Sequence, residues 1–254
     1  MKKYFKLQLL GLLALLSLPI TIFAACPPDS VQSGPSCVDK YEASVWKINP
    51  SNINVIHRVK NGTATLAILN AVGAVQIGLS PGDYVANGCP FTGAGCVDVY
   101  AVSIPGVYPS NHISYFQAIA AARNSEKRLL TNSEWQTAAL GTVDGSPCAL
   151  STLSLTGSAP GCVSDIGAFD MVGNIHEMVA EWFTPQSVPD CPGIGGWGSF
   201  SDDHLCYSGA YSLLRGGGYS GSASGTGAGV FASDNAYLPG NSAGNDNVGF
   251  RSIR

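Results

Sequence analysis

The residues of this sequence that most clearly could do chemistry are its eight cysteines, which fall into four close pairs along the chain. An even number of closely paired cysteines is typical of disulfide bonds in exported proteins. Zinc binding is the alternative use, but the sequence has no C-x-x-C pair and no histidine spacing of the zinc-finger type. The simplest pairing is sequential, and other connectivities stay open. The proposed bridges are Cys26–Cys37, Cys89–Cys96, Cys148–Cys162 and Cys191–Cys206.

The other reactive side chains do not complete a metal-protease or phosphate-binding template. His176 and Glu177 begin a zincin-like sequence, but Ala180 stands where the H-E-x-x-H motif needs its second histidine. The glycine-rich C-terminal region contains no lysine, which a phosphate-binding loop requires. These patterns favour a protein without catalytic activity, although they leave the question open.

Two capping boxes mark the clearest helices that must support these residues. Ser114 and Gln117 form an S-x-x-Q box before an alanine-rich run. Thr131 and Glu134 form a second box before a shorter helix, which we expect to end at Gly141. The remaining predictions are strands over 38–46 and 97–104, a short helix over 64–72, a cysteine-stapled loop over 80–96, and loop-like segments over 142–165 and 184–212.

The first 25 residues have the pattern of an export signal. Three lysines within the first six residues precede an apolar run over 9–23, which small residues follow. The run is short for a bilayer span of about 20 apolar residues, and no basic stop-transfer cluster follows it. We expect cleavage of residues 1–25 and a single domain over 26–254, in the periplasm, at the cell surface or outside the cell. Lipidation of Cys26 is the second alternative, and it would leave Cys37 without its bridge partner.

The charge pattern bears on the choice of partners. Only 12% of the residues are charged, and the formal net charge is −4. Nucleic-acid binding depends on a basic surface that neutralises phosphates, and this sequence has no basic stripe. We therefore expect no nucleic-acid partner and no transmembrane segment in the mature chain.

Four segments in order resemble the formylglycine-generating-enzyme, or sulfatase-modifying-factor, family. They are Asp39 to Ser44, Ser114 to Trp135 with its Lys127-Arg128-Leu129-Leu130 run, Asp170 to Trp182, and Leu214 to Gly218 with the closing Gly249-Phe250-Arg251. The resemblance covers roughly residues 37–254. It implies an irregular, loop-rich α+β fold of the C-type lectin type. Arg215 and Arg251 are interpreted as structural, because a buried guanidinium needs acceptors to be tolerated.

The resemblance also implies two metal sites. This sequence lacks the residues of the copper site and has those of the calcium site. The family's oxidase activity uses a C-terminal cysteine pair to hold copper, and residues 207–254 contain no cysteine. No copper is therefore expected, and an iron site is not expected either, because the four histidines are scattered singly. By resemblance, a structural calcium ion would be bound by the side chains of Asp170 and Glu177 and the carbonyls of Gly173 and Ile175.

Residues 216–248 form a segment of unusual composition, without any Lys, Arg, Glu, Gln, Trp or Met. If the adenines of asparagine codons (AAC or AAT) were replaced at random, the resulting codons could not encode Lys, Glu, Gln, Trp or Met. The composition of the segment is what such a process would leave. The segment resembles the variable region of proteins diversified by retroelements. Tyr, Ser, Gly and Asn also suit adaptable recognition surfaces. The candidate ligand-binding residues are Tyr219, Ser220, Ser222, Ser224, Thr226, Ser233, Asp234, Asn235, Tyr237, Asn241, Asn245, Asp246 and Asn247.

A flexible low-complexity loop is the alternative reading of this segment. Val230, Phe231, Leu238, Val248 and Phe250 interrupt its polar run and are expected to anchor it to the core. We therefore predict a noncatalytic binder of a protein or glycan, secreted or displayed at the surface, with a diversified C-terminal site. A divergent oxidase that modifies a sulfatase cysteine and a structural envelope component are the alternatives.

Overall fold

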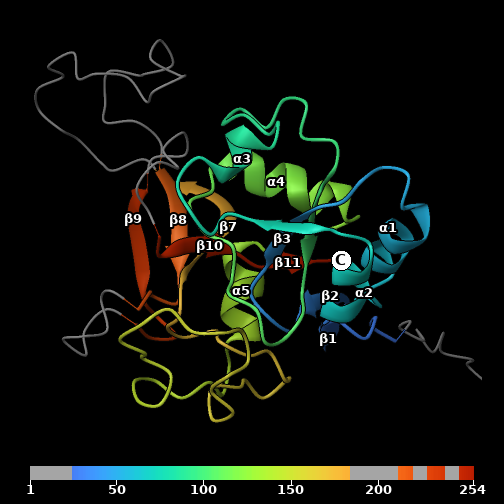
Figure 1. Cartoon of the computed structure of the whole chain (residues 1–254). Coiled ribbons are helices and arrows are strands. Elements are labelled where there is room, and N and C mark those ends of the chain that lie inside the picture. The colour runs from blue at the N-terminus through green and yellow to red at the C-terminus, as the bar shows by residue number, and fades with distance from the viewer. Residues whose placement is uncertain (1–24, 184–210, 220–227, 238–245) are drawn as a thin grey trace, which may run out of the picture.

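The computed structural model describes residues 25–183, 211–219, 228–237 and 246–254 (Figure 1). These residues form three small sheets. The first has the strand order β1 (Ser30–Ser33), β2 (Ser36–Asp39), β11 (Ser252–Ile253) and β6 (Arg128–Leu129). The second has the order β10 (Val248–Phe250), β7 (His176–Phe183), β8 (Tyr211–Arg215) and β9 (Ser233–Tyr237). The third has the order β4 (Val75–Ile77), β3 (Ser44–Lys47) and β5 (Val99–Val102).

Five helices accompany the sheets in the described ranges. They are α1 (Ile53–Lys60), α2 (Leu66–Ala71), α3 (Asp83–Ala86), α4 (Tyr115–Asn124) and α5 (Asn132–Ala138). Both predicted capping boxes are present, with the reciprocal hydrogen bonds of Ser114 with Gln117 and of Thr131 with Glu134. The short elements and long connections make this an irregular α+β fold, as the sequence predicts.

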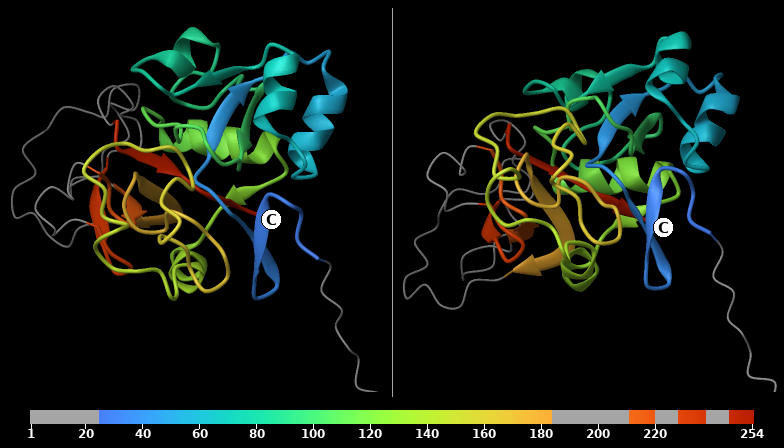
Figure 2. Two further views of the ribbon diagram at one scale, coloured as in Figure 1. Left: turned by 60° about the horizontal axis from the view of Figure 1, so that its bottom comes forward. Right: turned by 90° about the horizontal axis from the view of Figure 1, so that it is seen from below.

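Helix α4 lies between the third sheet, which is N-terminal, and the second sheet, which is C-terminal (Figure 2). Its buried Ala121 belongs to the same apolar cluster as Val45 of β3, Met178 of β7 and Phe250 of β10. Small alanine side chains let the surrounding strands approach this helix closely. The N-terminal third sheet and the C-terminal second sheet therefore share one core.

The strand predicted over 38–46 is interrupted in the structure. The chain leaves β2 at Asp39 and enters β3 at Ser44, so it passes from the first sheet to the third. Between them, the Tyr41 amide donates to Ser103 Oγ, and the Ala43 amide donates to the Phe250 carbonyl. These hydrogen bonds replace ladder pairing, and local alternation of residue types could not reveal them.

Other element boundaries also differ from the sequence prediction. The helix expected over 64–72 is α2, which begins after the Thr65 side chain caps the Ile68 amide. The stapled loop over 80–96 contains α3. Helix α1 is not predicted from the sequence, and its N-cap Asn52 makes no side-chain capping bond in the structure.

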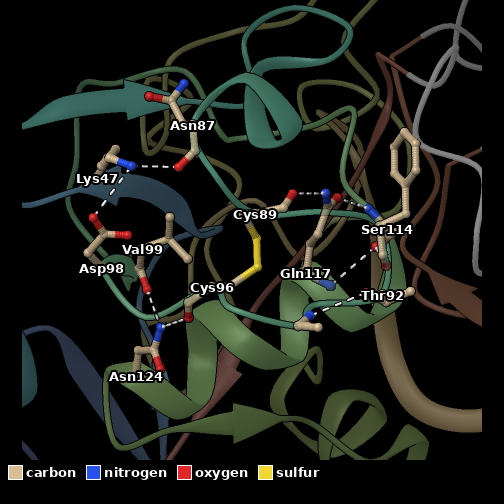
Figure 3. The surroundings of a disulfide bond; sticks show 12 residues. Lys47, Asn87, Cys89, Thr92, Cys96, Asp98, Val99, Ser114, Gln117 and Asn124 are labelled. Atoms are coloured by element: carbon tan, nitrogen blue, oxygen red, sulfur yellow. Dashed lines mark hydrogen bonds and ion pairs between the residues drawn. A yellow bond between two sulfur atoms is a disulfide. The ribbon is translucent and has the colours of Figure 1, made fainter.

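Three of the four sequential bridges are present, and they are Cys26–Cys37, Cys89–Cys96 and Cys148–Cys162. Cys191 and Cys206 lie outside the described residues. Figure 3 shows how the Cys89–Cys96 loop is fastened to α4. Gln117 Nε2 donates to the Cys89 carbonyl at 2.7 Å, and Asn124 Nδ2 donates to the Cys96 carbonyl at 2.6 Å. The bridge therefore holds a loop that also contacts both ends of the central helix.

The predicted signal over 1–25 cannot be placed, because residues 1–24 lie outside the described residues. Within the described ranges, no helix has the length and apolar character needed to cross a membrane. Disulfides persist in oxidising compartments, so the three bridges are compatible with export. Export itself stays a prediction.

Candidate functional site

The segments that carry the family resemblance meet in a buried polar network. Arg251 donates from Nη2 to Glu177 Oε1 at 2.7 Å, and both side chains are almost completely buried. Trp135 Nε1 donates to Glu177 Oε2 at 2.6 Å. The remaining Arg251 donors reach the carbonyls of Asp39 and Phe169 at 2.9 and 2.6 Å. Arg251 thus joins the C-terminal end of the chain to Asp39, Phe169 and Glu177, in agreement with its predicted structural role.

A second ion-pair group lies where the first sheet meets the start of the described chain. Lys127 Nζ contacts Asp39 Oδ1 at 2.7 Å and Asp29 Oδ2 at 2.8 Å. Arg254 contacts Asp29 Oδ1 at 2.8 Å. Burial raises the pKa of Asp39 to about 6, although Lys127 acts in the opposite direction. All of these side chains have partners, so this group supports the fold.

Three carboxylates gather around the single guanidinium of Arg251. Glu42 accepts hydrogen bonds from Asn174 Nδ2 at 2.5 Å and from the Ile175 amide at 3.2 Å. Burial, with the negative charges of Asp170 and Glu177, raises the pKa of Glu42 well above its ordinary value. Burial also raises the pKa of Asp170 to about 6. The cluster carries more negative than positive charge, and this makes it sensitive to pH.

Both side chains proposed as calcium ligands already accept hydrogen bonds in this arrangement. Both oxygens of Glu177 accept from Arg251, and Trp135 donates to one of them as well. Asp170 Oδ2 accepts from the Gly157 amide at 2.6 Å. Among the described residues, no three His, Cys, Asp or Glu side chains are grouped to hold a metal ion. Glu177 therefore does not fit the proposed role in this arrangement.

Calcium is accordingly expected to leave the thermal stability of the protein unchanged. A carboxylate that is held by a buried guanidinium would have to give up that ion pair before it could bind the cation. The midpoint of thermal unfolding should be the same in millimolar calcium and in excess chelator. A higher midpoint in calcium that disappears in Asp170→Asn would instead show that the predicted site forms.

Arg215 ties the C-terminal segment to α5. Its guanidinium lies 4.9 Å from the ring centroid of Trp135 and hydrogen-bonds Gln136 Oε1. The same group donates to the Val230 carbonyl at 3.1 Å. The Gly229 amide donates to the Gly216 carbonyl at 3.1 Å. Residues around 229 are thereby held beside the end of β8, which agrees with the structural role predicted for Arg215.

Only some of the predicted anchors of this segment are buried. Val248 and Phe250 are buried in the main core, and Val230 is half-buried. Phe231 is 78% exposed, so its prediction as an anchor is wrong. The Val230 carbonyl bonded to Arg215 fixes this turn without the neighbouring ring. Leu238 lies outside the described residues.

Tyr219 and Asp246 bring the two ends of the candidate binding segment together. Burial raises the pKa of the Tyr219 hydroxyl to about 12, and the neighbouring Asp246 carboxylate acts in the same direction through hydrogen bonding and its negative charge. The neighbouring Asn111 donates from Nδ2 to the Asp246 carbonyl at 2.6 Å. The amide of Tyr219 also donates to the Asn174 carbonyl at 2.8 Å, so the pair is fixed to the scaffold.

Asn111 and His112 belong to this site although the sequence gives no sign of it. Asn111 Oδ1 and His112 Nδ1 are buried and have no hydrogen-bond partner among the described residues. His112 has a left-handed backbone with φ of 49°, an unfavourable conformation that the surroundings must maintain. Burial lowers the pKa of His112, while the charges of Asp246 and Asp83 act in the opposite direction. No sequence motif surrounds these two residues, so their role depends on tertiary contacts.

The structure places part of the predicted ligand-binding set. Tyr219 and Asn247 are half-buried, whereas Ser233 and Asp246 are exposed. Asp234, Asn235 and Tyr237 lie on β9, which pairs with β8 at the edge of the second sheet. The predicted residues outside the described ranges are Ser220, Ser222, Ser224, Thr226, Asn241 and Asn245.

The part of the chain that matches a known family contains residues of the buried polar network. Residues 154–254 match the family described as the sulfatase-modifying factor enzyme 1-like domain. Over these residues the chain is similar to the sulfatase-modifying-factor family. The match includes Glu177, Arg215 and Arg251, which make the buried contacts described above. No curated protein sequence matches the chain.

Solved structures extend the likeness to most of the chain. The Major Tropism Determinant I1 variant is 15% identical with a TM-score of 0.50, over 89% of this chain and 52% of that one. The U1 variant is 16% identical with a TM-score of 0.48, over 91% and 53%. A structure titled CarF is 15% identical with a TM-score of 0.42, over 86% and 85%. The chain thus spans about half the length of the tropism determinants, and the I1 likeness shows the predicted C-type lectin-like fold.

Proposed function

We propose that this chain is a noncatalytic recognition protein whose ligand-binding surface is built on residues 216–248. The composition of that segment carries the proposal, because Tyr, Ser, Gly, Asn and Asp supply contact area and adaptable hydrogen bonds. Retroelement-diversified variable proteins, the group to which the Major Tropism Determinant variants belong, are the fitting functional class. The ligand is a protein or a glycan, and the protein is secreted or displayed at the surface.

The geometry at the two ends of the segment supports this proposal. Arg215 and the Gly216–Gly229 hydrogen bond hold the segment against the scaffold on one side. Tyr219 and Asp246 hold it on the other side, above Asn111. A recognition segment gains affinity when its ends are fixed, because less conformational freedom is lost on binding.

The binding proposal predicts that substitutions at Tyr219 and Asp246 weaken recognition. The purified protein would be screened on a glycan array and on a panel of cell-surface proteins. For any ligand found, Tyr219→Ala with Asp246→Ala should weaken binding at least about tenfold, as loss of central contact residues does. The matched control is Asn54→Ala, an exposed polar residue on α1, which should bind as the parent does. Equal binding by all three proteins would contradict the proposed surface.

The diversification part of the proposal has its own test in the neighbouring DNA. A reverse transcriptase gene should lie nearby, with an adenine-rich template copy of the sequence that encodes residues 216–248. Absence of both would remove diversification and leave ligand binding to be judged by the screen.

A divergent oxidase is the second candidate, and the family match over residues 154–254 favours it. Copper chemistry of that type needs a pair of thiolates, and residues 207–254 contain no cysteine. An oxygen-consumption assay with copper and a cysteine-containing peptide of the sulfatase type separates the two functions. Turnover would overturn the binding proposal. A screen without hits across tail variants would instead favour a structural envelope component.

A further inference from the structure

A pocket of about 500 Å³ is lined by residues of α4, β6 and β7 and by none of the described residues of the C-terminal segment. Tyr115 and Ile119 of α4, Leu129 of β6 and Ala180 of β7 supply apolar walls. The size is typical of pockets that bind small organic molecules, which are mostly apolar with a few polar groups. Neither the family resemblance nor the proposed recognition surface accounts for it.

Among the described residues, the charged side chains that line this pocket are cations. They are Lys127, Arg123 and Arg128. The Lys127 ammonium is already held by Asp29 and Asp39. Arg128 is likewise paired with Glu134 through contacts of 2.7 Å.

Arg123 differs from its two neighbours. It is exposed near the end of α4, and its side chain has no acidic or hydrogen-bonding partner among the described residues. Its guanidinium can form a paired hydrogen bond with a carboxylate without first breaking an existing contact. The apolar walls and this available cation together specify a ligand that is apolar at one end and anionic at the other.

The wall formed by Tyr115 is rigid. Its hydroxyl donates to the Ala180 carbonyl at 2.8 Å, and this bond joins α4 to β7 across the pocket. Trp182 packs edge-on against the Tyr115 ring with a centroid distance of 4.6 Å and is 41% exposed. A pocket with fixed walls loses little conformational freedom when a ligand enters.

We propose that this pocket binds a small amphiphilic carboxylate, with its hydrocarbon chain along Ile119, Leu129 and Ala180 and its carboxylate at Arg123. The chain excludes water from the apolar wall, and the carboxylate pairs with the free guanidinium. This binding is independent of the C-terminal recognition surface.

The test compares three probes with the same ten-carbon chain, which are decanoate, 1-decanol and decyltrimethylammonium. Binding to the full mature chain is measured by calorimetry and by tryptophan fluorescence. Decanoate should bind more tightly than either other probe. Arg123→Gln should weaken decanoate binding about three- to tenfold and leave 1-decanol unchanged. The matched control, Arg58→Gln on α1, removes another exposed arginine and should leave decanoate binding unchanged.

Two variants fill the pocket without changing its charge. Ala180→Leu and Ile119→Phe should each weaken both decanoate and 1-decanol, and unfolding curves establish that the variants are folded. Equal affinity for the three probes would overturn the proposal, as would equal effects of the Arg123 and Arg58 variants. Binding of anionic lipid vesicles without binding of monomeric decanoate would also overturn it, because it would identify a membrane surface as the partner.

Discussion

Arg251→Met is expected to destabilise the protein by about 3–5 kcal/mol, the cost of removing one partner from a buried ion pair. The substitution removes the cation that faces Glu177, and Glu42 and Asp170 lie in the same electrostatic environment. It also leaves the carbonyls of Asp39 and Phe169 without their guanidinium donor. Urea unfolding at neutral pH would measure the loss.

The exposed arginine Arg128 provides the matched control. Its pair with Glu134 has the same 2.7 Å contact distance but lies largely in solvent, so Arg128→Met should cost at most about 1 kcal/mol. Adding Glu177→Gln to Arg251→Met should recover part of the stability, because the unpaired buried charge is then removed. Similar losses for Arg251→Met and Arg128→Met would show that the buried network does not stabilise the fold as argued.

Local signals in the sequence predicted the parts of the fold that depend on neighbouring residues. The S-x-x-Q box at Ser114 and the second box at Thr131 predicted α4 and α5, because each cap bonds a backbone amide three residues away. The three bridges were predicted because their cysteines also lie close together in the sequence, 7 to 14 positions apart. The order of four weak motifs then predicted the fold class.

The remaining features depend on residues far apart in the chain. Lys127 pairs with Asp29 across 98 positions, and Arg251 pairs with Glu177 across 74. The family resemblance implied that Glu177 is a calcium ligand, and nothing in the sequence shows that Arg251 donates to this carboxylate. Asn111 was missed for a related reason, since its contact with Asp246 spans 135 positions.

Asp170→Asn is expected to stabilise the protein near neutral pH and to have little effect near pH 4. Burial raises the pKa of Asp170 from 3.8 to about 6, with a smaller contribution from the charge of Glu177. The folded state therefore binds more protons than the unfolded state between about pH 4 and pH 6. The stabilisation that protonated Asp170 provides is fully present below its unfolded pKa of 3.8, and it is lost as the pH rises through its folded pKa of about 6.

The size of the effect follows from the shift of roughly two pKa units. Each unit corresponds to about 1.4 kcal/mol, so ionised Asp170 costs up to about 3 kcal/mol at pH 7. Asparagine retains an oxygen to accept the Gly157 amide and tolerates the left-handed φ of 58° at this position. The variant should thus remove the ionisation cost while keeping the local structure.

Urea unfolding of both proteins from pH 3.5 to 7.5, in chelator, would test this expectation. The stability of the parent should decline more steeply with pH than that of Asp170→Asn, and Asp39 accounts for a decline that both share. Asp83→Asn supplies a control of opposite sign. Hydrogen bonds from the Ser80 hydroxyl and from the amides of residues 78–80 lower the pKa of Asp83. The contribution of ionised Asp83 to stability is therefore present above its pKa in the unfolded chain and is lost as the pH falls through its folded pKa. Parallel pH profiles for the parent and Asp170→Asn would mean that Asp170 is not held in a buried, negatively charged cluster.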